Sequence, residues 1–189
     1  MSSTASTTGA AVTYEIDAAH SSAQFKIRHM MISNVRGAFA RVSGTVMTDP
    51  SNPEHSSVVA EIDVTSVNTN DEKRDAHLRS EDFFHVEKHP VMTFRSNKVE
   101  HKGGHEFQVN GDLTIRGVTK PVTLSVETTD EVKDPWGNQR IGATATGKVD
   151  SAAASPQLRH SAHVFFVSAL SPVSEDSVPT ATPVLREST

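Results

Sequence analysis

The side chains best suited to chemistry are concentrated in residues 74–95, which read RDAHLRSEDFFHVEKHPVMTFR and hold three of the 10 histidines. His77, His85 and His89 are candidate metal ligands, since imidazole is a common ligand of zinc. His85 and His89 are four residues apart, which suits a shared metal only within a helix, and Pro90 disfavours helix at the residue before it. The segment has no HExxH motif, and a closed metal site needs further partners. Surface or hydrogen-bonding histidines are therefore the favoured interpretation.

Charged residues in the same segment offer a second kind of chemistry. Arg74, Asp75, Arg79, Glu81 and Asp82 have the charges needed to bind the polar head of a ligand. The alternative is a solvated helix face on which Asp75 and Arg79 form an i,i+4 pair, worth only a few tenths of a kcal/mol. We favour the solvated face.

A catalytic nucleophile is not indicated. The chain has no cysteine, which excludes disulfides, thiolate metal ligands and cysteine nucleophiles. Serines are abundant, but none lies in a nucleophile-elbow motif. The sequence therefore predicts neither an enzyme nor a bound cofactor, and a metal-dependent enzyme that uses the three histidines is the alternative.

The elements that would position these residues are mostly strands. Apolar and polar residues alternate with period two, as in half-buried strands, over 22–30, 35–48, 57–66, 91–99, 105–116, 121–131 and 140–149. Within 35–48 the apolar parity changes near Ala40 and Arg41, which predicts a bulge or bend. This bend and the glycines at inward positions favour a closed antiparallel barrel over a sandwich.

One helix interrupts the strands. It is expected from Asp71 to Asp82, with Leu78 as its one strongly apolar interior residue. A helix this short is not stable alone in water. We therefore expect Phe83 and Phe84 to anchor it to the barrel.

The inside of such a barrel is either a filled core or a cavity. Alternation alone does not decide between them, because a barrel of about eight strands lies at the size where both occur. Small side chains at inward positions would leave room for a ligand: Ala23, Gly37, Gly44, Ala60, Gly111, Ala143 and Gly147.

The bulk properties describe one domain with tails. The 189 residues carry a net charge of −5, which gives no basic surface for nucleic acid, and no apolar run is long enough to span a membrane. Residues 1–12 are expected to form a disordered tail without a secretory signal, which favours a cytoplasmic location. The barrel is expected over 13–150. Residues 151–189, rich in Ser, Ala, Pro and Thr, are expected to be largely disordered, apart from the strand-like stretch His163 to Leu170.

Four segments, HSSAQFKIRHMMISNVRGAF, RDAHLRSEDFFHVEKHPVMTF, GDLTIRGVTKPVTL and DPWGNQRIG, resemble the YceI-like family over residues 14–149. The resemblance implies a lipocalin-like, all-β antiparallel barrel with one short helix beside it. It also implies a polyisoprenoid or quinone-type lipid in the interior, no catalysis, and a homodimer as in some family members. The implied ligand-binding residues are Phe25, Ile27, Phe39, Val46, Ile62, Phe83, Phe84, Phe94, Leu113, Ile115 and Leu124.

The end of the chain departs from the family pattern. After Val149 the family has an Asn-Arg-x-x-Phe-Gly-Leu-type segment and a final hairpin, whereas this chain continues SAAASPQLR. Two outcomes are open. The barrel is incompletely closed and has lost ligand binding, or His163 to Leu170 supplies a substitute strand.

Overall fold

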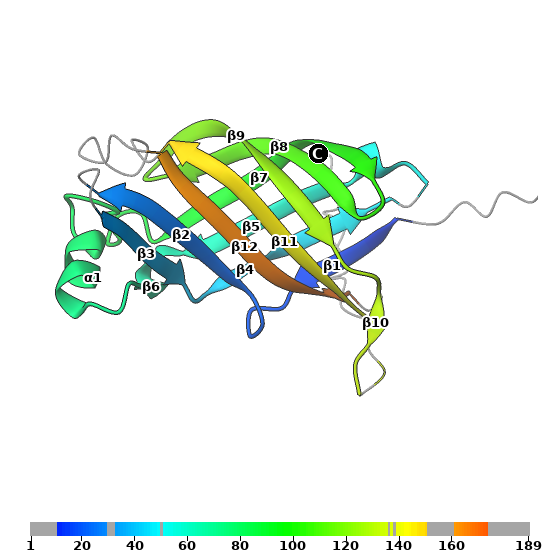
Figure 1. Ribbon diagram of the computed structural model, residues 1–189, viewed down its shortest axis with the longest axis horizontal. Coiled ribbons are helices and arrows are strands. Elements are labelled where there is room, and N and C mark those ends of the chain that lie inside the picture. The colour runs from blue at the N-terminus through cyan, green and yellow to red at the C-terminus, as the bar shows by residue number, and fades with distance from the viewer. Residues whose placement is uncertain are drawn as a thin grey trace, which may run out of the picture.

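The computed structural model describes residues 11–29, 33–49, 51–135, 137, 139–150 and 161–173. These residues form strands, one α-helix and two short 3-10 turns (Figure 1). The strands are β1 (Val12–Ile16), β2 (Ser22–His29), β3 (Ser33–Phe39), β4 (Val42–Thr48), β5 (Ser57–Asp63), β6 (Val67–Asn68), β7 (Val91–Gly103), β8 (Glu106–Ile115), β9 (Val118–Thr128), β10 (Val132–Lys133), β11 (Gln139–Asp150) and β12 (Ser161–Pro172). The helix is α1 (Glu72–Arg79), and the turns are η1 (Pro53–His55) and η2 (Val64–Ser66).

The sheet closes into an eight-stranded antiparallel barrel, which confirms the predicted fold class. Hydrogen-bonded neighbours run β1, β4, β5, β7, β8, β9, β11 and β12, and β12 pairs again with β1. Strands β2, β3 and β6 continue the walls formed by β1, β4 and β5 at one end of the barrel. Among the described residues, no helix is long and apolar enough to cross a membrane.

Strand β12 closes the ring. One edge pairs with β11 from Ile141↔Leu170 to Asp150↔Ser161. The other edge pairs with β2 from Ala162↔Ile27 onwards and then with β1 up to Tyr14↔Pro172. The substitute strand is thus longer than the stretch His163 to Leu170, and the barrel reaches past residue 150. Val12, the last residue of the expected N-terminal tail, begins β1, and residues 1–10, 151–160 and 174–189 of the expected tails lie outside the described part of the chain.

The predicted bend near Ala40 and Arg41 is confirmed as a break between two strands. β3 ends at Phe39 and pairs with β2 and β6, whereas β4 begins at Val42 and pairs with β1 and β5. The neighbouring wall breaks between β1 and β2 as well. Two adjacent walls of the barrel therefore bend together.

Other boundaries differ from the expected ones. β5 stops at Asp63, whose carboxylate accepts a hydrogen bond from the Thr65 amide at 2.8 Å and so starts η2. α1 begins at Glu72 because Asp71 caps it, accepting a hydrogen bond from the Arg74 amide at 3.0 Å, and it ends at Arg79, where Ser80 is the extended C-cap, so it is shorter than 71–82. β7 extends to Gly103 through a register shift between Ser96 and Lys98.

The two ends of the barrel are built differently. At one end, the "α1 end", the connections that the structure describes are residues 69–90, which contain α1, and the turn 116–117. At the other end, the "open end", they are residues 49–56, the hairpin 103–106 and residues 129–138, which contain β10. In Figure 1, α1 and β10 lie at opposite ends of the barrel.

Candidate ligand-binding site in the barrel interior

The interior at the α1 end is filled by packed apolar side chains. The ring of Phe39 lies 5.4 Å from that of Phe25 and 5.7 Å from that of Phe84, measured between centroids. Ile62 and Val67 beside them are 1% and 0% exposed. Aromatic rings at these separations pack favourably, so this end is core.

Helix α1 is held over that core by its charged residues. Arg79 donates from Nε to the Thr65 carbonyl at 3.0 Å and from Nη2 to the Val67 carbonyl at 2.6 Å. The buried carboxylate of Asp75 accepts hydrogen bonds from the amide of Thr69 at 2.9 Å and from its hydroxyl at 2.5 Å. The expected Asp75–Arg79 pair on a solvated face is therefore wrong. Backbone groups next to η2 and β6 need partners when buried, and the helix supplies them.

The segment after α1 is also fixed to the barrel. Phe84 is buried against the core, and Phe83 is partly buried. Arg116 donates from Nη1 to the Phe83 carbonyl at 2.6 Å. The expected anchoring of the helix by this aromatic pair is confirmed.

The three histidines lie outside this core. His77 Nε2 is 3.3 Å from Asp82 Oδ2, and the His85 and His89 rings are 6.1 Å apart. Desolvation and the charges of Lys88, His85 and Arg116 lower the pKa of His89. Within the described residues, no three histidine or carboxylate side chains gather in a way that would hold a metal ion.

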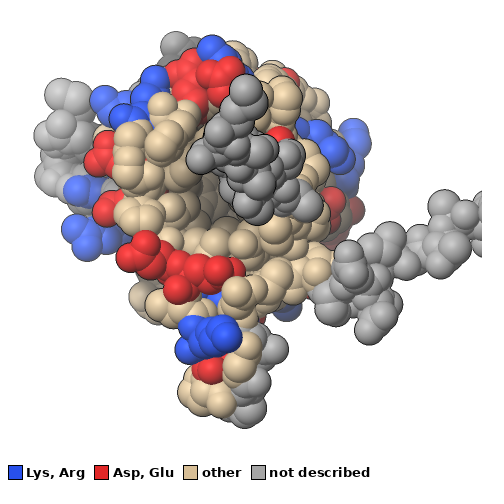
Figure 2. Space-filling model, turned by 90° about the vertical axis from the view of Figure 1, so that its right-hand side faces the viewer, with Lys and Arg blue, Asp and Glu red and all other residues tan. Residues whose placement is uncertain are grey.

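The interior at the open end is hollow. Apolar side chains there pack against the buried core but are only partly buried: Val12, Val46, Val58, Phe107, Val126, Ile141, Ala143, Ala145 and Phe166. Because the wall is closed, solvent reaches them through the open end. Figure 2 shows this face with a hollow bordered largely by uncharged residues. We call these nine side chains the "lumen lining".

The room in the lumen does not come from the glycines as expected. A Cβ on Gly111 would lie 2.7 Å from the ring of Phe94, and one on Gly147 would lie 2.6 Å from Leu124. The ring of Phe25 covers Gly37 in the same way. These glycines accommodate large side chains from neighbouring strands, whereas Ala143 and Ala145 on β11 are only partly buried.

The eleven predicted ligand-binding residues divide between the two ends. Val46 belongs to the lumen lining, and Phe83 is partly buried beside α1. The described residues that are buried within the core are Phe25, Phe39, Ile62, Phe84, Phe94, Leu113, Ile115 and Leu124. The side chain of Ile27 lies outside the described part of the structure. Ligand contact by any of the eleven stays a prediction.

Sequence reasoning missed most of the lumen lining. Val126, Ile141 and Ala145 lie at alternating positions of the predicted strands 121–131 and 140–149, so the signal for an inward face was present. They were nevertheless not among the predicted ligand-binding residues. Phe166 lies in the stretch His163 to Leu170, which was predicted as a possible strand but not as part of the ligand site. Its alternation with Val164 and Leu170 was the signal for an inward face.

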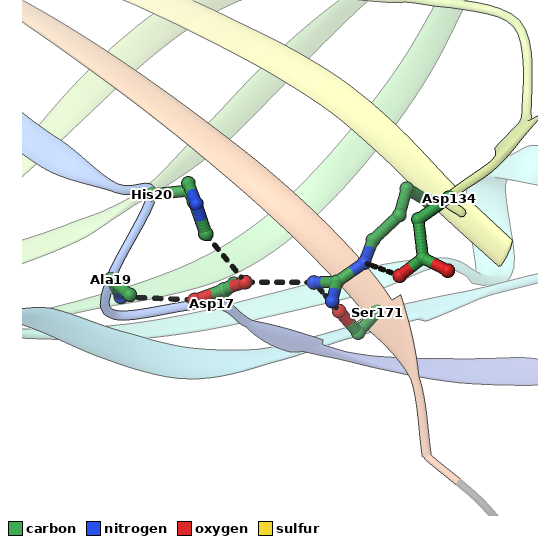
Figure 3. A network of polar contacts seen from close by, with 6 residues as sticks. Asp17, Ala19, His20, Asp134 and Ser171 are labelled. Atoms are coloured by element: carbon green, nitrogen blue, oxygen red, sulfur yellow. Dashed lines mark hydrogen bonds and ion pairs between the residues drawn. The ribbon is translucent and has the colours of Figure 1, made fainter. Parts of the chain in front are cut away.

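A polar network joins the barrel strands at the open end (Figure 3). Arg140 on β11 donates from Nη1 to Asp17 Oδ2 at 2.7 Å and to Ser171 Oγ at 2.5 Å, and from Nε to Asp134 Oδ2 at 3.2 Å. The hydrogen bond from His20 Nδ1, at 3.0 Å, lowers the pKa of Asp17, and Arg140 lowers it further. The network ties the β1–β2 bend, β11, β12 and the 129–138 connection together.

A separate depression of about 860 Å³ is open to solvent beside β8, β9, β11 and β12. Much of its lining alternates with buried interior residues and therefore faces outward, including Thr123, Ser125, Lys148 and His163. Polar side chains on an outer wall do not suit a long apolar chain, because such a ligand needs apolar surroundings. The lumen is the better candidate site.

Comparisons with known proteins agree with this architecture. The model of the YceI-like domain matches residues 14–157 and so ends before β12. Protein YceI of Escherichia coli O157:H7 is 43% identical over 141 residues, which are 74% of this chain and 73% of that protein.

Solved structures share the fold. The YCEI protein of Campylobacter jejuni has a TM-score of 0.66 at 31% identity, covering 79% of this chain and 91% of that one. A polyisoprenoid binding domain from Saccharophagus degradans, implicated in plant cell wall breakdown, has a TM-score of 0.61 at 18% identity, covering 86% and 99%. The resemblance carried by the four sequence motifs is confirmed: the chain belongs to the YceI-like family.

Proposed function

We propose that this protein binds an isoprenoid or a similar long-chain amphiphile in the hollow half of its barrel, without catalysis. The observation that carries the proposal is the partly exposed lumen lining inside a closed wall. Apolar surface removed from water contributes about 25 cal/mol per Å². A long alkyl chain in the lumen would therefore be retained with few polar contacts.

The family relationship supports this proposal. The domain from S. degradans that shares the fold is described as binding a polyisoprenoid. The side chains that make up the lumen lining are hydrocarbons, which suits retention of an alkyl chain. A cytoplasmic location and a homodimer stay predictions.

The test is native mass spectrometry of the purified chain, followed by lipid analysis after denaturation. We expect an added mass that is released as a long-chain lipid. Ala145→Phe should fill the lumen and remove this mass, because Ala145 points inward and is only partly buried. The control is Thr144→Phe, which adds a ring at the neighbouring exposed position of the same strand. Lipid-free, folded protein from the native host would overturn the proposal and favour a barrel that no longer binds a ligand.

A further inference from the structure

The connections at the open end carry a strong excess of negative charge. We call residues 49–56, 103–106 and 129–138 the "rim". Its described residues include six carboxylates and one lysine: Asp49, Glu54, Glu106, Asp130, Glu131, Asp134 and Lys133. At the α1 end, the connections 69–90 and 116–117 carry six carboxylates and five basic residues. Figure 2 shows acidic residues beside the hollow.

Cations on the strands next to the rim are already paired with carboxylates. Lys98 and Lys102 each lie 2.6 Å from an oxygen of Glu100, and their hydrogen bonds, that of Lys102 first, lower the pKa of Glu100 to about 2. Arg140 is held by Asp17 and Asp134. A phosphate that approached Lys98, Lys102 or Arg140 would have to compete with the carboxylates that already hold these three cations.

The open end also holds one inward-facing hydroxyl group. Tyr14 on β1 points inward and is 7% exposed. Burial raises the pKa of its hydroxyl, and the negative charge of Glu131 raises it further. Gln139 donates to Glu131 Oε2 at 3.2 Å and helps to position it. At neutral pH the Tyr14 hydroxyl is protonated, so it can donate a hydrogen bond to an uncharged oxygen.

We infer that the rim selects lipids with an uncharged head group, such as a prenol or a quinone, and rejects prenyl phosphates with the same tail. This inference rests on the proposed function, because an apolar tail inside the lumen leaves the head group at the open end. There a phosphate meets like charges, whereas a hydroxyl or carbonyl does not. Specificity then comes from repulsion of the wrong ligand as well as from attraction of the right one.

The experiment compares geranylgeraniol with geranylgeranyl diphosphate, two probes with the same tail. Their affinities for the full chain are measured by native mass spectrometry and by titration calorimetry at low and high salt. We expect the alcohol to bind at least about tenfold more tightly at low salt, and the gap to narrow as salt screens the rim. If both probes bind equally, or if the diphosphate binds more tightly, the inference is overturned. If neither binds to folded protein, the proposed function fails.

Two variants make the same change in charge at opposite ends. Glu131→Lys should raise the affinity for the diphosphate several-fold and leave that for the alcohol nearly unchanged. Glu87→Lys, at an exposed position in the 69–90 connection, should change neither affinity. Equal effects of the two variants would show that net charge alone is at work and would overturn the assignment to the rim.

Discussion

The two ends of the barrel differ in what covers their apolar residues. At the α1 end, the helix and the segment after it lie over the interior, and Ile62, Val64 and Val67 are at most 1% exposed. At the open end, no helix in the described part of the chain covers the lumen lining, and Val126 and Ala145 stay partly exposed. The same two-residue alternation therefore provides cohesion at one end and a binding surface at the other.

Arginines illustrate the same difference. Arg79 reaches from α1 to two carbonyls next to β6 and so fixes a cover onto the wall. Arg140 instead joins neighbouring strands around the open end. The Arg79 guanidinium holds a helix over the barrel interior, whereas the Arg140 guanidinium joins neighbouring strands of the wall and leaves the interior uncovered.

The largest difference between the two ends should be the loss of stability caused by a Phe→Ala substitution at each end. Phe39→Ala should lower the free energy of unfolding by about 3–5 kcal/mol, because it leaves a cavity between Phe25 and Phe84. Phe107→Ala, in the partly exposed lumen lining, should lower it by less than about 2 kcal/mol. Urea denaturation of the ligand-free variants measures both values.

Equal losses in the free energy of unfolding would contradict the proposed difference between the ends, since they would mean that the open end is packed as tightly as the α1 end. Bound lipid would have the same effect by burying Phe107, so removal of lipid before the measurement is the necessary control.

A second difference concerns the cover itself. Arg79→Met keeps much of the side-chain volume but leaves the Thr65 and Val67 carbonyls without these donors. We expect a loss of about 2–3 kcal/mol in the free energy of unfolding. Arg95→Met, at an exposed position on β7, is the matched control and should change stability by less than about 0.5 kcal/mol. Similar losses from both variants would show that Arg79 acts through general charge and not by fixing the helix.

The fold was largely predictable because strand periodicity carries most of its information. Alternation placed the strands close to their observed bounds, and the parity change near Ala40 located a real break. The helix was found because residues 71–79 do not alternate. These features are local, and local pattern is what sequence reasoning reads well.

What could not be predicted depends on contacts between distant residues. The pairing of Asp75 with Thr69, rather than with Arg79, follows from burial of the helix against β6. Gly111 looked like space for a ligand, yet the ring of Phe94 on the neighbouring strand covers it. Strand β12 was predicted in part, as His163 to Leu170, but its pairing with β11 on one edge and with β2 and β1 on the other could not be predicted from its own residues. In each case the deciding partner belongs to another segment of the chain.

The smallest expected difference is the acid sensitivity of the open end. The pKa of Asp17 in the folded protein is lowered by its hydrogen bonds, first of all that from His20. Because the folded-state pKa lies below that of the unfolded chain, the carboxylate stabilises the fold at neutral pH. This contribution is lost as the pH falls from about 4 through the folded-state pKa. Acid should therefore loosen the Arg140 network and the end of β12 that it holds.

Hydrogen exchange at low pH can isolate this effect. The pH range 5 to 3 spans the ordinary carboxyl pKa of about 4. As the pH falls through this range, amides near Leu170 in β12 should lose protection from exchange in the wild type. They should lose less protection in Asp17→Asn, because this variant has no carboxylate to protonate at position 17. We expect a difference of less than about 1 kcal/mol in opening free energy, as for a partly exposed ion pair. Amides of α1 should respond alike in both proteins, since Asp17 does not touch that end. If the β12 amides of Asp17→Asn lose protection as steeply as those of the wild type, carboxylates other than Asp17 cause the acid sensitivity of the open end. The Arg140 network would then not account for the difference between the two ends.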